Sequence, residues 1–271
     1  MRLLSYLLAV LPFTASHPAA ILPFRKRFIF SALVVGAIAP DLHYFIGVDQ
    51  HFHATHTVAG AFYICLPSAL SVLWLFQRVL KLPLISLAPI GLQPRLVRFA
   101  EPFRFGPAKR FVCILVSLLI GIFSHLLWDS FTHGRGYMVR QFSALQTVPL
   151  AQYGIYRPLY NLLQHVSSLM GVGILVSAYY RWSERAQPQP VPEKLQLSPR
   201  IKCVSLVAIG AAAAILGLIC GFAESRQSTR VAAFFVDGVI WFTTLTIAGL
   251  VVFSLYWHKG LRSGPSISQP S

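Results

Sequence analysis

Residues 111–129 read FVCILVSLLIGIFSHLLWD, an apolar run that ends on His125 and Asp129. A run of this kind approaches the ~20 residues that cross a hydrocarbon core about 30 Å thick. Its backbone must be helical there, because lipid offers no partner for unsatisfied peptide groups. Ionisable side chains at membrane depth are costly and usually serve a function. The run therefore predicts a transmembrane helix that carries a polar site.

The composition extends this interpretation to the whole chain. Of the 271 residues, 55% are hydrophobic and 11% are charged, whereas soluble domains carry roughly 25% charged residues. We expect an all-α fold, a polytopic transmembrane helical bundle with about six spans. A short N-terminal helix within residues 3–24 and an interfacial basic loop over residues 77–110 complete it. The candidate spans are residues 28–48, 57–76, 111–128, 166–182, 201–223 and 234–257.

Three parts are expected along the chain. Residues 12–180 form a membrane domain that carries the polar cluster. Residues 201–257 form a C-terminal two-helix transmembrane extension. Residues 258–271 are mostly small and polar, a composition that predicts a disordered tail.

The basic residues exclude one class of partner and predict an orientation. The net charge of +15 would suit nucleic acid, but the lysines and arginines lie in the gaps between apolar runs. Positive charge in cytoplasmic loops is typical of membrane proteins. When Arg25, Lys26 and Arg27 are placed in the cytoplasm, most of the 23 basic residues fall on that side. We therefore expect membrane lipid as a partner, no nucleic acid, and a polar cluster toward the outer face.

Two groups of imidazoles and carboxylates supply that cluster. His125, Asp129 and His133 are four residues apart, so the first two share one face of a helix. The other group surrounds the first expected outer loop, and its members are Asp41, His43, His51, His53 and His56. Histidine and carboxylate side chains are common ligands of zinc and related metals. The pattern therefore predicts a site for a divalent metal, with zinc favoured.

Each candidate has a plainer interpretation as well. Asp41 follows Pro40 and is also a suitable N-cap for the next helical turn. A histidine within a span is often a hydrogen-bonded packing residue, and His51 and His53 suit a solvated loop. His56 is the better ligand of that loop. His17 precedes the basic triplet, so it reaches the cluster only if residues 3–24 fold back into the bundle or follow a cleaved signal peptide.

Metal-activated water is the catalytic chemistry that these residues support. A bound divalent ion lowers the pKa of its water toward neutrality. Asp41 or Asp129 would then orient or deprotonate that water. The sequence has no G-x-S-x-G turn, no phosphate-binding glycine loop and no C-x-x-C pair.

The polar residues stand in a series of motifs, which are Phe13-Thr14-x-Ser16-His17-Pro18-Ala19-Ala20, Ala39-Pro40-Asp41-x-x-Tyr44-Phe45, His56-Thr57, Ser124-His125-x-x-Trp128-Asp129-Ser130-Phe131-Thr132-His133, and Gln164 with Ser167-Ser168-Leu169-x-Gly171. Together these motifs resemble the bacterial membrane family catalogued as domain of unknown function 4184. The resemblance covers residues 12–180 and implies a multi-pass protein of the bacterial inner (cytoplasmic) membrane. The typical N-terminus of that family, Met-Pro-Phe-Thr, corresponds to the stretch from Leu11, so residues 1–10 would be an extension.

More remotely, the pattern is similar to the YdjM-like membrane-bound metal-dependent hydrolases. Those proteins carry an N-terminal histidine, a Pro-Asp-x-Asp stretch, a Thr-His-Ser and a Ser-His-x-x-x-Asp. The resemblance implies a ligand set made of His17, Asp41, His56, His125 and Asp129. This chain departs from the pattern at His43, which stands where the second acid would be, and that change leaves the number of metal ions open.

Two functions fit the sequence. The first is a membrane-embedded metal-dependent hydrolase that acts on a lipid or phosphodiester substrate. The second is a non-enzymatic integral membrane protein, either a transporter or a structural bundle that uses the His/Asp cluster as a polar lock. No internal repeat of the kind found in transporters is evident. The sequence leaves the oligomeric state open.

Overall fold

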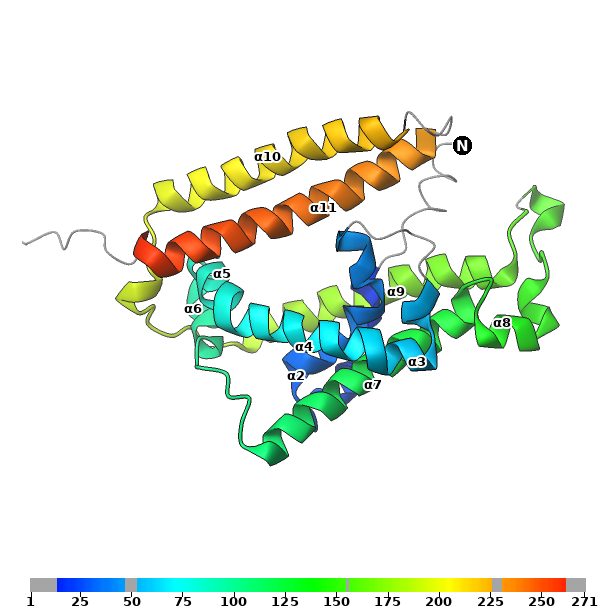
Figure 1. The fold of residues 1–271 in the computed structure, drawn as a ribbon, viewed down its shortest axis with the longest axis horizontal. Coiled ribbons are helices and arrows are strands. Elements are labelled where there is room, and N and C mark those ends of the chain that lie inside the picture. The colour runs from blue at the N-terminus through cyan, green and yellow to red at the C-terminus, as the bar shows by residue number, and fades with distance from the viewer. Residues whose placement is uncertain (1–13, 47–52, 155, 226–230, 262–271) are drawn as a thin grey trace, which may run out of the picture. The chain divides into compact units, whose positions relative to one another are not determined.

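The computed structural model describes residues 14–46, 53–154, 156–225 and 231–261 (Figure 1). All regular structure in these ranges is helical, which confirms the expected all-α helical bundle. The described chain divides into two compact units. Unit 1 comprises residues 1–73 and 104–182, and unit 2 comprises residues 74–103 and 183–271. Predictions that concern residues 1–13, His51 or the tail from residue 262 lie outside the described residues.

Among the described residues, five helices are long and apolar enough to cross a membrane, and they correspond to five of the six expected spans. The first of the six candidate spans, residues 28–48, differs. It is a shorter apolar segment in which helix α2 (Phe30–Ile38) gives way to a 3-10 helix, η3 (Ala39–Ile46). Pro40 removes a backbone donor where the change occurs, which accounts for the shortening. The five long segments are Val58–Leu87, Ala108–Gln141, Leu159–Arg185, Glu193–Ala223 and Asp237–Gly260.

Unit 1 contains most of the short helical elements as well as two long helices. Its N-terminal stretch is folded as two 3-10 helices, in agreement with the short N-terminal helix expected there. The elements are η1 (Thr14–Ala19), η2 (Leu22–Phe24), α2, η3, η4 (His53–His56), α3 (Val58–Gly60), η5 (Ala61–Cys65), most of α4 (Leu66–Leu75), α7 (Ala108–Thr132), α8 (Tyr137–Gln141), η8 (Ser143–Gln146), η9 (Ala151–Tyr153) and most of α9 (Leu159–Arg185).

Helices α2 and α7 pack closely through two glycines. A Cβ atom on Gly36 would collide with the backbone of Leu118, and one on Gly121 would collide with the backbone of Leu33 and Ala37. Small residues of this kind let membrane helices approach until their backbones touch. The close packing also brings the carbonyl oxygen of Ala37 within hydrogen-bonding distance of the side chain of His125 on α7.

Unit 2 is built around a pair of long helices, α10 (Pro199–Ser225) and α11 (Val231–Tyr256), which lie side by side (Figure 1). The buried Lys202 donates to the carbonyl of Ala88, at 3.0 Å, and to Oε1 of Gln93, at 2.7 Å. A small core consists of Ile85, Leu87, Leu195, Phe253 and Trp257. The other elements are η6 (Phe76–Leu80), α5 (Lys81–Leu87), α6 (Gln93–Leu96), η7 (Val97–Phe99), η10 (Glu193–Leu195) and η11 (Trp257–Leu261).

Two expectations for unit 2 need adjustment. The basic segment 77–110 is not a simple loop, because helical structure continues from the preceding span through Leu87 and returns at α6. Within this segment, the ammonium group of Lys81 donates to the carbonyl oxygen of Glu101 at 2.6 Å. This basic side chain is therefore bonded to the protein backbone. Residues 258–261 of the expected tail belong to the helical η11.

The glycine contact predicts a difference between two alanine substitutions. Gly121→Ala should destabilise the protein by roughly 1–3 kcal/mol, because backbone atoms of α2 cannot yield to the added methyl group. Gly173→Ala on α9 should be neutral or slightly stabilising, because open space surrounds that position and alanine is the better helix former. Thermal unfolding of both variants in the same detergent tests this, and equal midpoints would refute the proposed packing.

Candidate metal centre

Unit 1 brings six of the seven predicted ligands together from four separate elements. His17 comes from η1, Asp41 from η3 and His56 from η4, whereas His125 and Asp129 lie on α7 and His133 directly follows that helix. Contacts between 3.1 and 3.6 Å connect these six side chains. His17, Asp41, His125 and Asp129 are all buried. The convergence expected from the sequence is therefore present.

Four donor atoms have the spacing of a metal coordination shell. Nε2 of His56 lies 3.3 Å from Oδ1 of Asp41 and 3.3 Å from Oδ2 of Asp129. Nε2 of His125 lies 3.6 and 3.2 Å from the same two oxygens. Ligands about 2.0–2.1 Å from a tetrahedral zinc ion stand roughly 3.3 Å apart. The four separations match four edges of such a tetrahedron.

The backbone fixes which nitrogen of His125 faces the carboxylates. Its Nδ1 lies 2.8 Å from the carbonyl oxygen of Ala37, which can only accept, so Nδ1 carries the proton. In the neutral ring, Nε2 then presents a lone pair toward two carboxylate oxygens. Nε2 is fully buried and has no partner in hydrogen-bond geometry. A cation at this point would satisfy it, and such backbone-oriented imidazoles are usual among metal ligands.

His17 approaches the other oxygen of Asp129. Its Nε2 lies 3.1 Å from Oδ1 of Asp129, and its Nδ1 faces the carbonyl of Thr14 at 3.3 Å. The ring stacks on that of His125, with centroids 3.8 Å apart and planes 14° apart. The N-terminal segment therefore does fold back to the cluster, as His17 requires. His17, His125 and Asp129 form a second group whose donor atoms all lie within 4.8 Å of one another.

His133 is placed differently from the other imidazoles. Its Nδ1 lies 3.2 Å from Oδ1 of Asp129, and its Nε2 lies 3.1 Å from the amide nitrogen of Gln164. The amide of Gln164 is oriented by Asn161, which donates to its oxygen at 3.3 Å. Gln164 thus donates to Nε2, so Nδ1 keeps its proton and donates to Asp129. His133, with 40% of its side chain exposed, is better described as a positioning residue than as a ligand.

His43 lies beside the cluster. Its Nδ1 donates to the carbonyl of Pro40 at 2.9 Å, and its ring packs 4.0 Å from that of Tyr44. The ring centroid is 6.1 Å from that of His56. His43 is therefore close enough to belong to the surroundings of the centre, and the four-donor set is complete without it.

Two residues of the site received no role from the sequence. Thr14 donates to Oδ2 of Asp41 at 2.6 Å and leaves Oδ1 to face the imidazoles. Gln164 orients His133 from α9. Both stand within the family motifs, but threonine and glutamine are not ordinary metal ligands. Their residue types therefore did not indicate a role in the site. Trp128, which donates to Ser167 at 3.1 Å, helps to hold α9 against this end of α7.

The comparison with protein families gives one match. The model described as "Domain of unknown function (DUF4184)" matches residues 11–255, which is most of the chain. Searches of curated proteins and of solved structures found no match.

Gln164 predicts a measurable effect on metal affinity. Gln164→Ala should weaken Zn²⁺ binding by up to roughly 10-fold, because Gln164 orients His133, which in turn positions the carboxylate ligand Asp129. Competition with a fluorescent chelator in detergent would measure it. Gln152→Ala, at an exposed position of η9, is the matched control. Equal affinities in the two variants would contradict the positioning role.

His56 predicts how metal affinity depends on pH. Burial opposes its charged form, but the carboxylates of Asp129 and Asp41 outweigh that effect and raise the pKa of His56 to about 9. A cation must displace this proton, so Zn²⁺ affinity should rise between pH 6.5 and 8, with His56 contributing about tenfold per pH unit. In His56→Asn the slope should fall by that amount. The same chelator competition at several pH values would measure it, and an unchanged slope would exclude His56 from the centre.

Proposed function

This chain belongs to the DUF4184 family, and we propose that it is a membrane-embedded, metal-dependent hydrolase. The observation that carries the proposal is the buried Nε2 of His125, which faces Asp41 and Asp129 without a hydrogen-bond partner. The proposed cofactor is a divalent metal, with zinc favoured by the nitrogen and oxygen donors. His56, His125 and Asp129 would hold the ion and would leave its fourth position to water, with the carboxylate of Asp41 beside that water and His17 adjoining the site.

The chain's own residues have distinct tasks in this proposal. A bound divalent ion supplies a water whose pKa is lowered toward neutrality. Both carboxylate oxygens of Asp129 contact imidazoles, so neither oxygen is available to take a proton from water. Asp41 is bonded to Thr14 through only one oxygen. It is the better candidate to orient and deprotonate that water.

A lipid or phosphodiester substrate fits the surroundings of the centre. Phe123, Leu127 and Phe131 follow one another at four-residue spacing on α7 and are 37%, 58% and 38% exposed. They form an apolar face on the same membrane-spanning segment that supplies His125 and Asp129. This face lies about 200° around the helix from His125 and Asp129, so it supports a bilayer setting for the centre and not a direct path to it. A bacterial inner-membrane location, with the centre toward the outer face, completes the proposal.

Metal content tests the first half of this proposal. Detergent-purified wild-type protein should contain about one equivalent of zinc or more per chain, measured by inductively coupled plasma mass spectrometry. Asp129→Asn and His125→Ala should lose it, and His165→Ala, outside the cluster, should retain it. Thermal unfolding must show that the variants remain folded. Metal-free wild-type protein would overturn the proposal and favour the polar lock, in which the same contacts only tie η1, η3, η4 and α7 together.

Hydrolysis tests the second half. Metal-loaded wild-type protein should cleave bis-p-nitrophenyl phosphate or a fluorescent phospholipid, and Asp41→Asn should lower the rate by about 100-fold or more. The apo protein should regain activity when Zn²⁺ is restored. A metal-loaded protein that is inactive on both substrate types would leave metal binding in place and remove the enzymatic assignment.

A further inference from the structure

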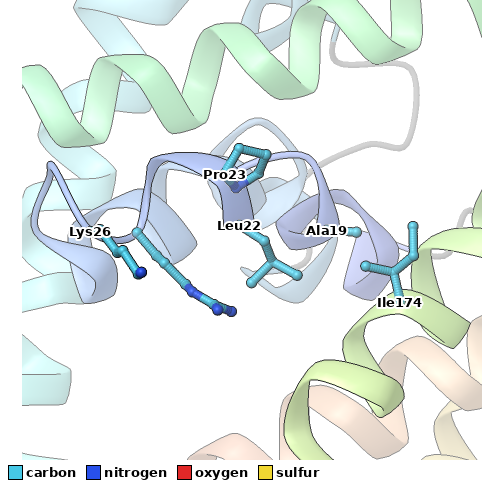
Figure 2. A pocket seen from close by; sticks show the side chains of 6 residues that line it. Ala19, Leu22, Pro23, Lys26 and Ile174 are labelled. Carbon is cyan, nitrogen blue, oxygen red and sulfur yellow. The ribbon is translucent and has the colours of Figure 1, made fainter. Parts of the chain in front are cut away.

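A cavity of about 450 Å³ lies in unit 1 between the N-terminal 3-10 helices and helix α9. Its size is in the range of small-molecule sites. Figure 2 shows Lys26 at one end of it and Ala19 beside Ile174 at the other. The lining residues are Ala19, Leu22, Pro23, Arg25, Lys26 and Ile174.

The cavity combines two kinds of surface. Arg25 and Lys26 supply two exposed cationic groups, and neither has an ion pair with an acidic side chain among the described residues. The other four lining residues are apolar. A ligand that matches both surfaces carries a negative charge at one end and hydrocarbon at the other.

The position of the cavity indicates where such a ligand comes from. Ile174 is 48% exposed on α9, a helix long and apolar enough to span a membrane. The basic residues stand shortly before α2, where the chain enters its first apolar helix. Basic residues next to a membrane segment attract anionic headgroups. The apolar wall on α9 is therefore open to lipid from the side.

We infer that this cavity binds an anionic phospholipid, with the headgroup phosphate at Arg25 and Lys26 and the start of an acyl chain against Leu22 and Ile174. The site is separate from the metal centre, and the inference holds whether or not the protein is a hydrolase. Ala19 lies in η1, the same short helix that carries His17. A bound lipid would therefore also hold in place the segment that delivers His17 to the cluster.

Charge removal provides the first test. Native mass spectrometry of the full chain should show more binding of phosphatidylglycerol than of phosphatidylcholine. The Arg25→Gln/Lys26→Gln variant should lose about tenfold or more of its phosphatidylglycerol affinity. Arg104→Gln/Lys109→Gln is the matched control, because it removes the same charge from exposed positions elsewhere in unit 1. Inorganic phosphate at millimolar concentration should not displace the lipid.

Filling the apolar end provides a second test that leaves every charge in place. Ile174→Trp should reduce phosphatidylglycerol binding, whereas Val176→Trp should not, because Val176 is exposed on the same helix and does not line the cavity. Equal losses in the two charge variants, or no effect of Ile174→Trp, would show only general attraction of a basic surface and would overturn the inference. Displacement by inorganic phosphate would point to a soluble anion and would overturn it as well.

Discussion

The carboxylate of Asp129 is the point on which unit 1 converges. Its two oxygens contact His17 and His133 on one side and His56 and His125 on the other, at 3.1 to 3.3 Å. An ionised carboxylate in an apolar segment is expensive unless charge or hydrogen bonds compensate it. Here the contacts come from imidazoles on two other segments, η1 and η4, and from two more on α7 and at its end. The burial of this one charge therefore depends on the assembly of the unit. Removal of a partner would leave that charge uncompensated, which is more costly than losing a surface pair.

The close packing of α2 and α7 serves the same centre. Gly36 and Gly121 let the two backbones meet, and that contact places the carbonyl of Ala37 at Nδ1 of His125. The imidazole is thereby fixed with its other nitrogen toward the carboxylates. Helix packing thus sets the direction of a lone pair, although neither glycine touches the site.

Hydropathy predicted the helical class and the five long membrane segments, because length and apolar composition alone determine whether a segment can span. The i, i+4 relation of His125 and Asp129 was equally readable, since a regular helix fixes that geometry. The interruption of the first apolar segment at Pro40 was readable too, because proline disrupts a helix. The sequence could not give the return of His17 to the cluster, because that return depends on how separate segments pack. The roles of Thr14 and Gln164 were hidden for another reason. Neither is a typical ligand, and only their contacts with Asp41 and His133 distinguish them.

The separation between His17 and Asp129 along the chain, 112 residues, has a consequence for biosynthesis. The N-terminal imidazole leaves the ribosome long before its carboxylate partner is made, and loop closure over such a distance is slow compared with local helix formation. Until α7 has been inserted, His17 and His56 lack the carboxylate of Asp129, and Asp41 lacks the imidazole of His125. A nascent chain halted before that helix would be a partly inserted precursor with an incomplete centre, and maturation of the site must wait for the second half of unit 1.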